Sequence, residues 1–312
     1  MKSDPIQAAL AKLDEIPLRT PVGKAAFLKA LSSKYNLVVA KAARIIGAAQ
    51  WLELNDELAT VCRELIERGG AGDKGCAALA ALCRALVGMD YDEPDLYLRG
   101  LRYRQLEPGW GGPSDAAVDV RSICAMGLVN TGYPYKLREL VPLLVDSEWI
   151  PRAGAVRAIA AVGSEAASLL LRLKTLSGDA EPEVMSECFT AMLVLDGADG
   201  VALVTRFASG TQPEIRESAI LALGASRRAD AVEWLCAAAG REWDPTFRKC
   251  LMLALSTSRT ERAIEFLLAT VAQGSRDAAG NAIEALALHR HDEALQQRVR
   301  AAMTRIGSDR LP

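Results

Sequence analysis

Apolar and polar positions alternate along most of this chain with the spacing of amphipathic helices, and prolines mark where those helices begin. Pro151, Pro182, Pro213 and Pro245 stand 31, 31 and 32 residues apart, and an apolar-periodic run follows each one. A proline suits the first turn of a helix, where its missing N–H leaves no hydrogen bond unmade. The spacing therefore predicts a repeated unit that opens with a helix at each proline.

Small residues recur in phase with these prolines. Alanines stand at steps of 33, 33, 31, 32 and 31 residues, namely Ala125, Ala158, Ala191, Ala222, Ala254 and Ala285. The next residue is apolar each time, namely Met126, Ile159, Met192, Leu223, Leu255 and Leu286. Nine residues after five of these alanines, another small residue begins a second run of apolar residues at helical spacing. These small residues are Ala167, Gly200, Ala231, Ala263 and Ala294. Small residues let two helices approach closely, so each unit is predicted to be helix, short turn, helix.

Such a pair of short helices cannot bury its own apolar stripe, so neighbouring pairs must stack. We therefore predict an all-α fold, a right-handed α-α superhelix of about seven or eight helical hairpins that share one continuous core.

The N-terminal third departs from this period, because the step from Ala85 to Ala125 is 40 residues. Two helical pairs are predicted there, over 36–51 with 56–68 and over 74–87 with 94–105, separated by the glycines of 69–72. We divide the chain into irregular N-terminal repeats or a cap over 1–112 and regular repeats over 113–312, in one solenoid. Two explanations of the irregular spacing stay open: the N-terminal repeats cap the solenoid, or a functional site is built into them.

Segments 212–224 and 244–256 share one pattern, in which Asp or Gln precedes Pro, an apolar residue precedes Arg, and small and leucine positions follow. This pattern resembles the HEAT repeat, and its short period is similar to the repeats of phycobilisome bilin lyases, over roughly residues 115–305. The resemblance implies that the proline-started helices line a concave face and the second helices a convex one.

That concave face supplies the first candidate site. Exposed positions are expected four and eight residues after each proline, off the buried stripe. A protein or peptide partner is predicted to bind there through Thr190, Glu217, Leu221, Lys249 and Leu253 at these positions, and through Arg157, six residues after Pro151. The alternative is that neighbouring repeats half-bury the leucines. The resemblance also implies an Asp–Arg ladder between repeats, which Asp244 and Arg248 match and which Glu181 and Gln212 do not.

The second candidate site is an edge patch around segment 97–113. All six tyrosines fall between Tyr35 and Tyr135, and this segment combines two of them with three arginines and a tryptophan. Trp, Tyr and Arg dominate binding hot spots. The predicted edge anchor consists of Arg99, Arg102, Tyr103, Arg104, Trp110, Tyr133 and Tyr135. The alternative is a long loop that packs over the core with Trp110 as its plug.

Composition excludes several classes of partner. Thirty-seven basic residues against thirty-nine acidic ones give a net charge of −2, so nucleic acid is disfavoured. The longest uncharged stretch, 122–135, is too short to span a bilayer, and Lys2, Asp4 and Pro5 at the start do not fit a signal peptide. We therefore expect a cytoplasmic protein with no membrane partner.

The sequence also lacks the sets of residues that catalytic and metal sites require. The seven cysteines are odd in number and scattered, and the histidines are His289 and His291 alone, so neither a zinc site nor a histidine-based mechanism is expected. The His-Glu pairs of HEAT-like di-iron hydroxylases are absent, as are a P-loop and a dinucleotide fingerprint.

We therefore predict a non-catalytic protein-interaction scaffold without a cofactor. One alternative, from the resemblance, is a bilin lyase subunit. A second is a HEAT-like DNA-binding or glycosylase-like protein, for which Asp115, Arg121 and Trp110 would be the relevant residues.

Overall fold

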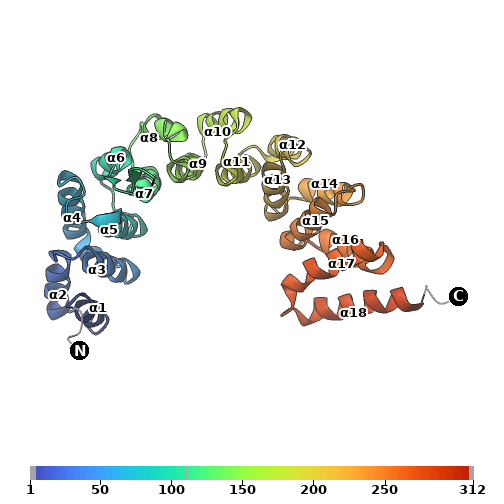
Figure 1. Ribbon diagram of the computed structural model, residues 1–312, viewed down its shortest axis with the longest axis horizontal. Helices are drawn as coiled ribbons and strands as arrows, with labels where there is room; N and C mark the ends of the chain where they lie inside the picture. Colours follow the sequence, from blue (N-terminus) through green and yellow to red (C-terminus); the bar gives the residue numbers. More distant parts are fainter. Residues whose placement is uncertain (1–4, 110, 309–312) are drawn as a thin grey trace. The chain divides into compact units, whose positions relative to one another are not determined.

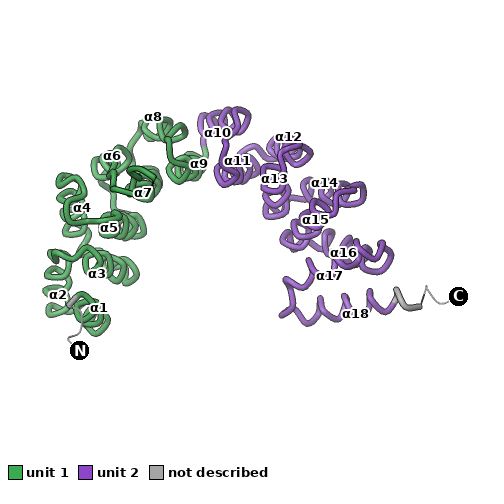
Figure 2. Tube along the Cα trace, viewed as in Figure 1, with its two compact units in different colours: residues 1–163 green, residues 164–312 purple. Residues whose placement is uncertain are grey.

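The computed structural model describes residues 5–109 and 111–308, and most of this part of the chain is helical. It consists of two compact units, residues 1–163 and 164–312 (Figure 2). The predicted all-α fold of stacked helix pairs is confirmed within each unit. The continuity of the core between the units, the handedness of the superhelix and the division at residues 112 and 113 stay predictions.

In unit 1, successive helices pack in two layers, with α3, α5, α7 and α9 forming the first layer and α2, α4 and α6 forming the second (Figure 1). The helices are α1 (Pro5–Asp14), α2 (Pro21–Leu31), α3 (Asn36–Ala48), η1 (Leu52–Leu54), α4 (Asn55–Glu67), η2 (Lys74–Cys76), α5 (Ala77–Gly88), α6 (Pro94–Arg102), α7 (Val118–Asn130), α8 (Lys136–Leu140), η3 (Val141–Val145) and α9 (Trp149–Val162). The first two of these were not predicted.

Unit 1 also departs from the prediction after α6. The helical pattern was expected to continue to Gln105, but α6 ends at Arg102 and a small antiparallel hairpin follows. Its strands are β1 (Leu106–Glu107) and β2 (Ser114–Asp115), with Leu106 opposite Asp115 and Glu107 opposite Ser114. The second helix of the next pair is broken into α8 and η3, because Pro142 cannot donate a hydrogen bond inside an α-helix.

In unit 2 the first layer is α11, α13, α15 and α17, and the second layer is α12, α14, α16 and α18. The helices are α10 (Glu165–Ser177), α11 (Pro182–Leu195), α12 (Gly197–Ala208), α13 (Pro213–Ala225), α14 (Ala229–Ala239), α15 (Pro245–Ser258), α16 (Glu261–Gln273), α17 (Arg276–Leu286), η4 (Ala287–His289) and α18 (Glu293–Ser308). As predicted, Pro182, Pro213 and Pro245 open α11, α13 and α15.

The alanine register marks equivalent buried places on the first-layer helices. All six alanines from 125 to 285 are buried, and the described residues of that span contain no strand. Gly224, two residues after one of them, shows how closely the helices approach, since a Cβ atom there would lie 2.3 Å from the carbonyl oxygen of Ala254 on α15. Of the small residues that open the second runs, Ala294 is the exception, because it is exposed on α18.

Candidate functional site

A buried ion-pair network occupies the region where an exposed edge patch was predicted. Arg121 of α7 is fully buried, and its guanidinium donates to Asp115 Oδ2 at 2.7 Å, to Asp146 Oδ2 at 3.1 Å and to the carbonyl oxygen of Tyr103 at 3.0 Å. Burial alone would raise the pKa of both aspartates, but backbone N–H donors and arginines hold both pKa values below their usual range. These ionised carboxylates are tied to a structural arginine, so Asp115 does not present a free catalytic acid of the glycosylase kind.

Gln105 extends this network to the helices before it. Its amide nitrogen donates to the carbonyl oxygen of Asp73 at 2.8 Å and to Glu107 Oε1 at 2.6 Å. Its amide oxygen accepts from Tyr103 Oη at 2.9 Å and from Cys76 Sγ at 3.0 Å. Every polar atom of this buried side chain is used, as buried polar groups require. In the described residues, the start of segment 97–113 is therefore packed against the core.

The arginines of the predicted edge patch all contact carboxylates. The guanidinium nitrogens of these arginines lie close to carboxylate oxygens. The distances are 2.8 Å from Arg99 Nε to Asp95 Oδ2, 2.6 Å from Arg102 Nη2 to Glu139 Oε2 and 2.8 Å from Arg104 Nη2 to Asp146 Oδ2. All three remain exposed at the surface. They are therefore available for contact, but their charges are already balanced.

The aromatic members of the patch are divided. Tyr103 is buried, and its hydroxyl donates inward to Gln105 Oε1. The prediction that Tyr103 forms part of an exposed contact surface was therefore wrong. Tyr133 is half-buried and Tyr135 is exposed, and their rings meet edge to face at 6.0 Å. Trp110 lies outside the described residues.

The predicted concave residues lie on first-layer helices. Thr190, Glu217 and Lys249 are exposed on α11, α13 and α15. Leu221 and Leu253 are half-buried, which agrees with the alternative given for these leucines. Of this set, the five residues named here belong to unit 2. Arg157 is exposed on α9 of unit 1, where it donates to Ser122 Oγ at 3.3 Å.

The implied Asp244–Arg248 ladder was wrong. The carboxylate of Asp244 instead caps α15, accepting from the backbone nitrogens of Thr246 and Phe247. Arg216 of the preceding repeat makes the inter-repeat contact instead. It forms an ion pair with Glu242, and its guanidinium carbon lies over the Phe247 ring, 3.8 Å from the ring centre. The sequence did not reveal Glu242, because acids in turns are common and only the fold brings it to Arg216.

Two surface features were missed by the sequence analysis. Trp243, beside that ion pair, is 89% exposed and offers a large aromatic surface before α15. Its signal was present in the Glu-Trp-Asp-Pro motif, where a tryptophan occupies an otherwise polar turn.

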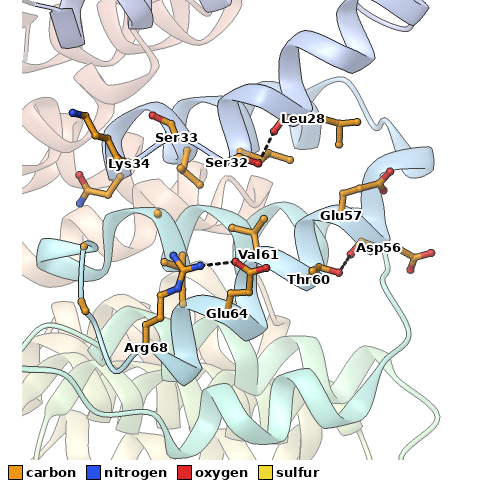
Figure 3. Close-up of a pocket in the computed structure, with 17 residues that line it drawn as sticks. Leu28, Ser32, Ser33, Lys34, Asp56, Glu57, Thr60, Val61, Glu64 and Arg68 are labelled. Carbon is orange, nitrogen blue, oxygen red and sulfur yellow. Dashed lines mark hydrogen bonds and ion pairs between the residues drawn. The ribbon is translucent and has the colours of Figure 1, made fainter.

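The other missed feature is a groove of about 620 Å³ in unit 1, between the second-layer helices α2 and α4. Half-buried Leu28, Val61 and Leu65 contribute to an apolar lining, together with the buried Leu31 and Val39. Figure 3 shows Lys34 and Arg68 toward one end of this groove and Asp56 and Glu57 toward the other. The groove therefore combines an apolar part with polar side chains such as Ser32, Asn36 and Thr60, and it carries charges of opposite sign toward its two ends.

The described residues hold no group of three or more His, Cys, Asp or Glu side chains that fits a metal ion. All seven thiols are buried, and burial raises the pKa of Cys188 to about 12. His289 is engaged by Ser256, 3.0 Å from its hydroxyl oxygen. No helix within the described part of the chain is long and apolar enough to cross a membrane.

Several solved structures are similar to this chain over most of both lengths, and the following three have low TM-scores. The first is human deoxyhypusine hydroxylase in complex with glycerol, 17% identical, covering 93% of this chain and 92% of the other, with a TM-score of 0.29. The second is the complex of CpcE and CpcF of phycocyanin lyase from Nostoc sp. PCC7120, 15% identical, covering 94% and 95%, with a TM-score of 0.37. The third is an engineered protein, 17% identical, covering 90% and 95%, with a TM-score of 0.22.

At these TM-scores and identities, the likenesses support no conclusion about this chain. No curated protein matches the chain. The family model of HEAT repeats matches residues 200–287, which run from the end of the first turn of α12 into η4. Residues 200–287 of this chain therefore match HEAT repeats.

Proposed function

We propose that this protein is a non-catalytic interaction module that binds a partner protein or peptide along the first-layer helices of unit 2. The observation that carries the proposal is that each of three successive first-layer helices, α11, α13 and α15, presents an exposed polar side chain near its buried register alanine. Glu217 and Lys249 lie four residues after their prolines, and Thr190 lies eight residues after Pro182. Stacked helical repeats present extended binding surfaces of this kind. Because the surface is ordered before binding, a partner does not have to order it on association.

The chemistry of this surface favours a protein over a polyanion. Glu217 and Lys249 carry opposite charges, and Lys249 is paired with Glu284 of the next first-layer helix at 2.7 Å. Half-buried leucines beside these charges offer apolar contact area. A phosphate backbone would require a set of uncompensated basic residues instead.

Site-specific photo-crosslinking in the native cell lysate tests the proposal. A photoreactive phenylalanine at residue 190 or 217 is expected to form an adduct with the same discrete protein. The matched controls are residues 202 and 237, which are exposed alanine positions on second-layer helices α12 and α14. Adducts formed equally from all four positions, or from none, would contradict the proposed surface.

A charge change then separates specific contact from proximity. We expect Glu217→Lys to weaken the crosslinked complex, while Glu265→Lys on α16 leaves it unchanged, because Glu265 is an exposed acid of the second layer. Equal loss for both variants would indicate a general charge effect rather than binding at the first layer.

A further inference from the structure

We propose that the groove between α2 and α4 binds an amphipathic helix of a partner protein, about three turns long, with its N-terminal end at Asp56 and Glu57 and its C-terminal end at Lys34. This site is in unit 1 and on second-layer helices, so it is separate from the surface proposed for unit 2. Either proposal can fail without the other.

The lining favours an apolar stripe. Leu28 from α2 and Val61 and Leu65 from α4 are each half-buried around the groove, so part of their apolar surface remains exposed to solvent. Covering such surface is favourable by about 25 cal/mol for each Å² removed from water. Val61 and Leu65 are four residues apart and share one face of α4, which is the spacing that an opposing helix with apolar residues at i and i+4 would match.

The walls favour a helix over an extended strand. Most of the lining residues belong to helices, chiefly α2 and α4, whose backbone groups are already hydrogen-bonded within each helix. An extended peptide would therefore lay unpaired N–H and C=O groups on an apolar lining, with no strand edge to receive them. A helix satisfies these groups internally and presents only side chains, as in the known helix-in-groove complexes.

The length follows from α4. The lining residues labelled in Figure 3 from Asp56 to Arg68, the residue that caps the C-terminus of α4, cover twelve steps along the helix axis, or about 18 Å at 1.5 Å per residue. A bound helix that lies along α4 over the same distance has about twelve residues, or three turns.

The charges define the direction. Neither Lys34 nor Asp56 makes an ion pair within the described part of the chain, whereas Arg68 is paired with Glu64 at 2.8 Å and Glu57 lies 3.8 Å from Lys24. Lys34 lies over the ring of Tyr35, 5.1 Å from its centre, and Asp56, in the first turn of α4, accepts from Tyr91 Oη at 3.5 Å. One positive charge and one negative charge without an ion-pair partner thus lie toward opposite ends (Figure 3). A helix carries partial positive charge at its N-terminus and partial negative charge at its C-terminus, so its favoured direction is from Asp56 toward Lys34.

The test uses a phage-displayed library of random 16-residue peptides, selected on the full-length chain. Enriched peptides are synthesised with a fluorophore, and their Kd values are measured by fluorescence anisotropy. We expect apolar residues at i, i+4 and i+7 and circular dichroism that becomes helical on binding. Val61→Glu places a charge in the apolar lining and is expected to weaken binding at least tenfold. Thr60→Arg, at an exposed lining position, is the second blocking variant should Val61→Glu fail to fold.

Charge variants and crosslinks test the direction. Lys34→Glu and Asp56→Lys are each expected to weaken binding about three- to fivefold, as for an exposed charge pair. The matched controls Lys29→Glu and Glu53→Lys change exposed charges outside the groove and should alter Kd less than twofold. A benzophenone at the peptide's N-terminus should crosslink near Asp56, and one at its C-terminus near Lys34.

Several results would overturn the proposal. These are selected peptides that tolerate both Val61→Glu and Thr60→Arg, selection that enriches nothing, or crosslinks in the opposite order. A wild-type dimer in sedimentation that Thr60→Arg converts to a monomer would assign the groove to a second copy of this chain instead of a partner.

Discussion

Replacing Arg121 by methionine should destabilise unit 1 strongly, because the change removes a buried cation and leaves its two carboxylates in place. The Arg121 side chain is 0% exposed, and those of Asp115 and Asp146 are 7% and 1% exposed. Breaking a buried pair by removing one partner costs about 3–5 kcal/mol. Arg104 remains 2.8 Å from Asp146, so we expect the lower end, about 3 kcal/mol.

Chemical and thermal denaturation followed by far-ultraviolet circular dichroism measure this loss. For a unit of this size, about 3 kcal/mol corresponds to a fall in Tm of about 6–12 °C. Arg84→Met, at an exposed position of α5 in the same unit, is the matched control and should change the free energy of unfolding by less than about 0.5 kcal/mol.

The pH dependence distinguishes charge from packing. In the wild type, the pKa values of Asp115 and Asp146 are lowered, so the stability they contribute is present above their unfolded pKa values, near 4, and is lost as pH falls through the folded values. The gap between wild type and Arg121→Met should therefore shrink on acidification, as the stranded carboxylates become neutral. A gap that is constant from pH 7 to pH 3, or one below about 1 kcal/mol at pH 7, would refute the ion-pair explanation.

Two further predictions concern the helix stack and the thiols. Gly224→Ala should lower the free energy of unfolding by about 1–3 kcal/mol despite the better helix propensity of alanine, because its Cβ would meet the Ala254 carbonyl oxygen. Gly280→Ala, where nothing lies within 4 Å, should raise it by about 0.5–1 kcal/mol, and urea denaturation that gives both changes the same sign would contradict the packing. Burial raises the pKa of Cys188 and of Cys250 to about 12, so the native protein should react with Ellman's reagent at pH 8 only after unfolding in urea; rapid reaction without urea would show that the thiols are accessible.

The repeat architecture was predictable because its signals are local and recur. A proline at the first turn and a small residue nine positions later act within one helix, so several copies reinforce the same register. The structure confirms the burial of every register alanine from 125 to 285.

The polar network was not predictable because its members meet only in three dimensions. Arg121 and Asp146 are 25 residues apart, and Asp73 and Gln105 are 32 apart. Nothing in the local pattern distinguishes a buried arginine or glutamine from a solvated one, since polar residues are mostly exposed. The aromatic and arginine content of segment 97–113 therefore indicated a surface, although the described part of it is largely tied inward.

The groove between α2 and α4 was not predictable for a related reason. Its α2 wall belongs to the N-terminal pair, which the sequence analysis did not identify, and its α4 wall bears a charged face typical of an ordinary solvated helix. Only the packing shows that Leu28 and Val61 line the same cavity.

Charged side chains of this protein differ in whether another charge pairs with them. Arg262 pairs with Glu233 at 2.7 Å and Arg298 with Glu261 at 2.6 Å, and each of these pairs joins helices of successive repeats. Such exposed pairs contribute little individually, about 0–1 kcal/mol, but they leave those charges compensated. A compensated charge gains less from a new partner, because the existing pair must be weakened or shared. Lys34, at the end of the groove, makes no ion pair within the described residues and contacts only the uncharged ring of Tyr35, 5.1 Å away, so we expect it to attract an incoming negative group more strongly than Arg262 or Arg298 would.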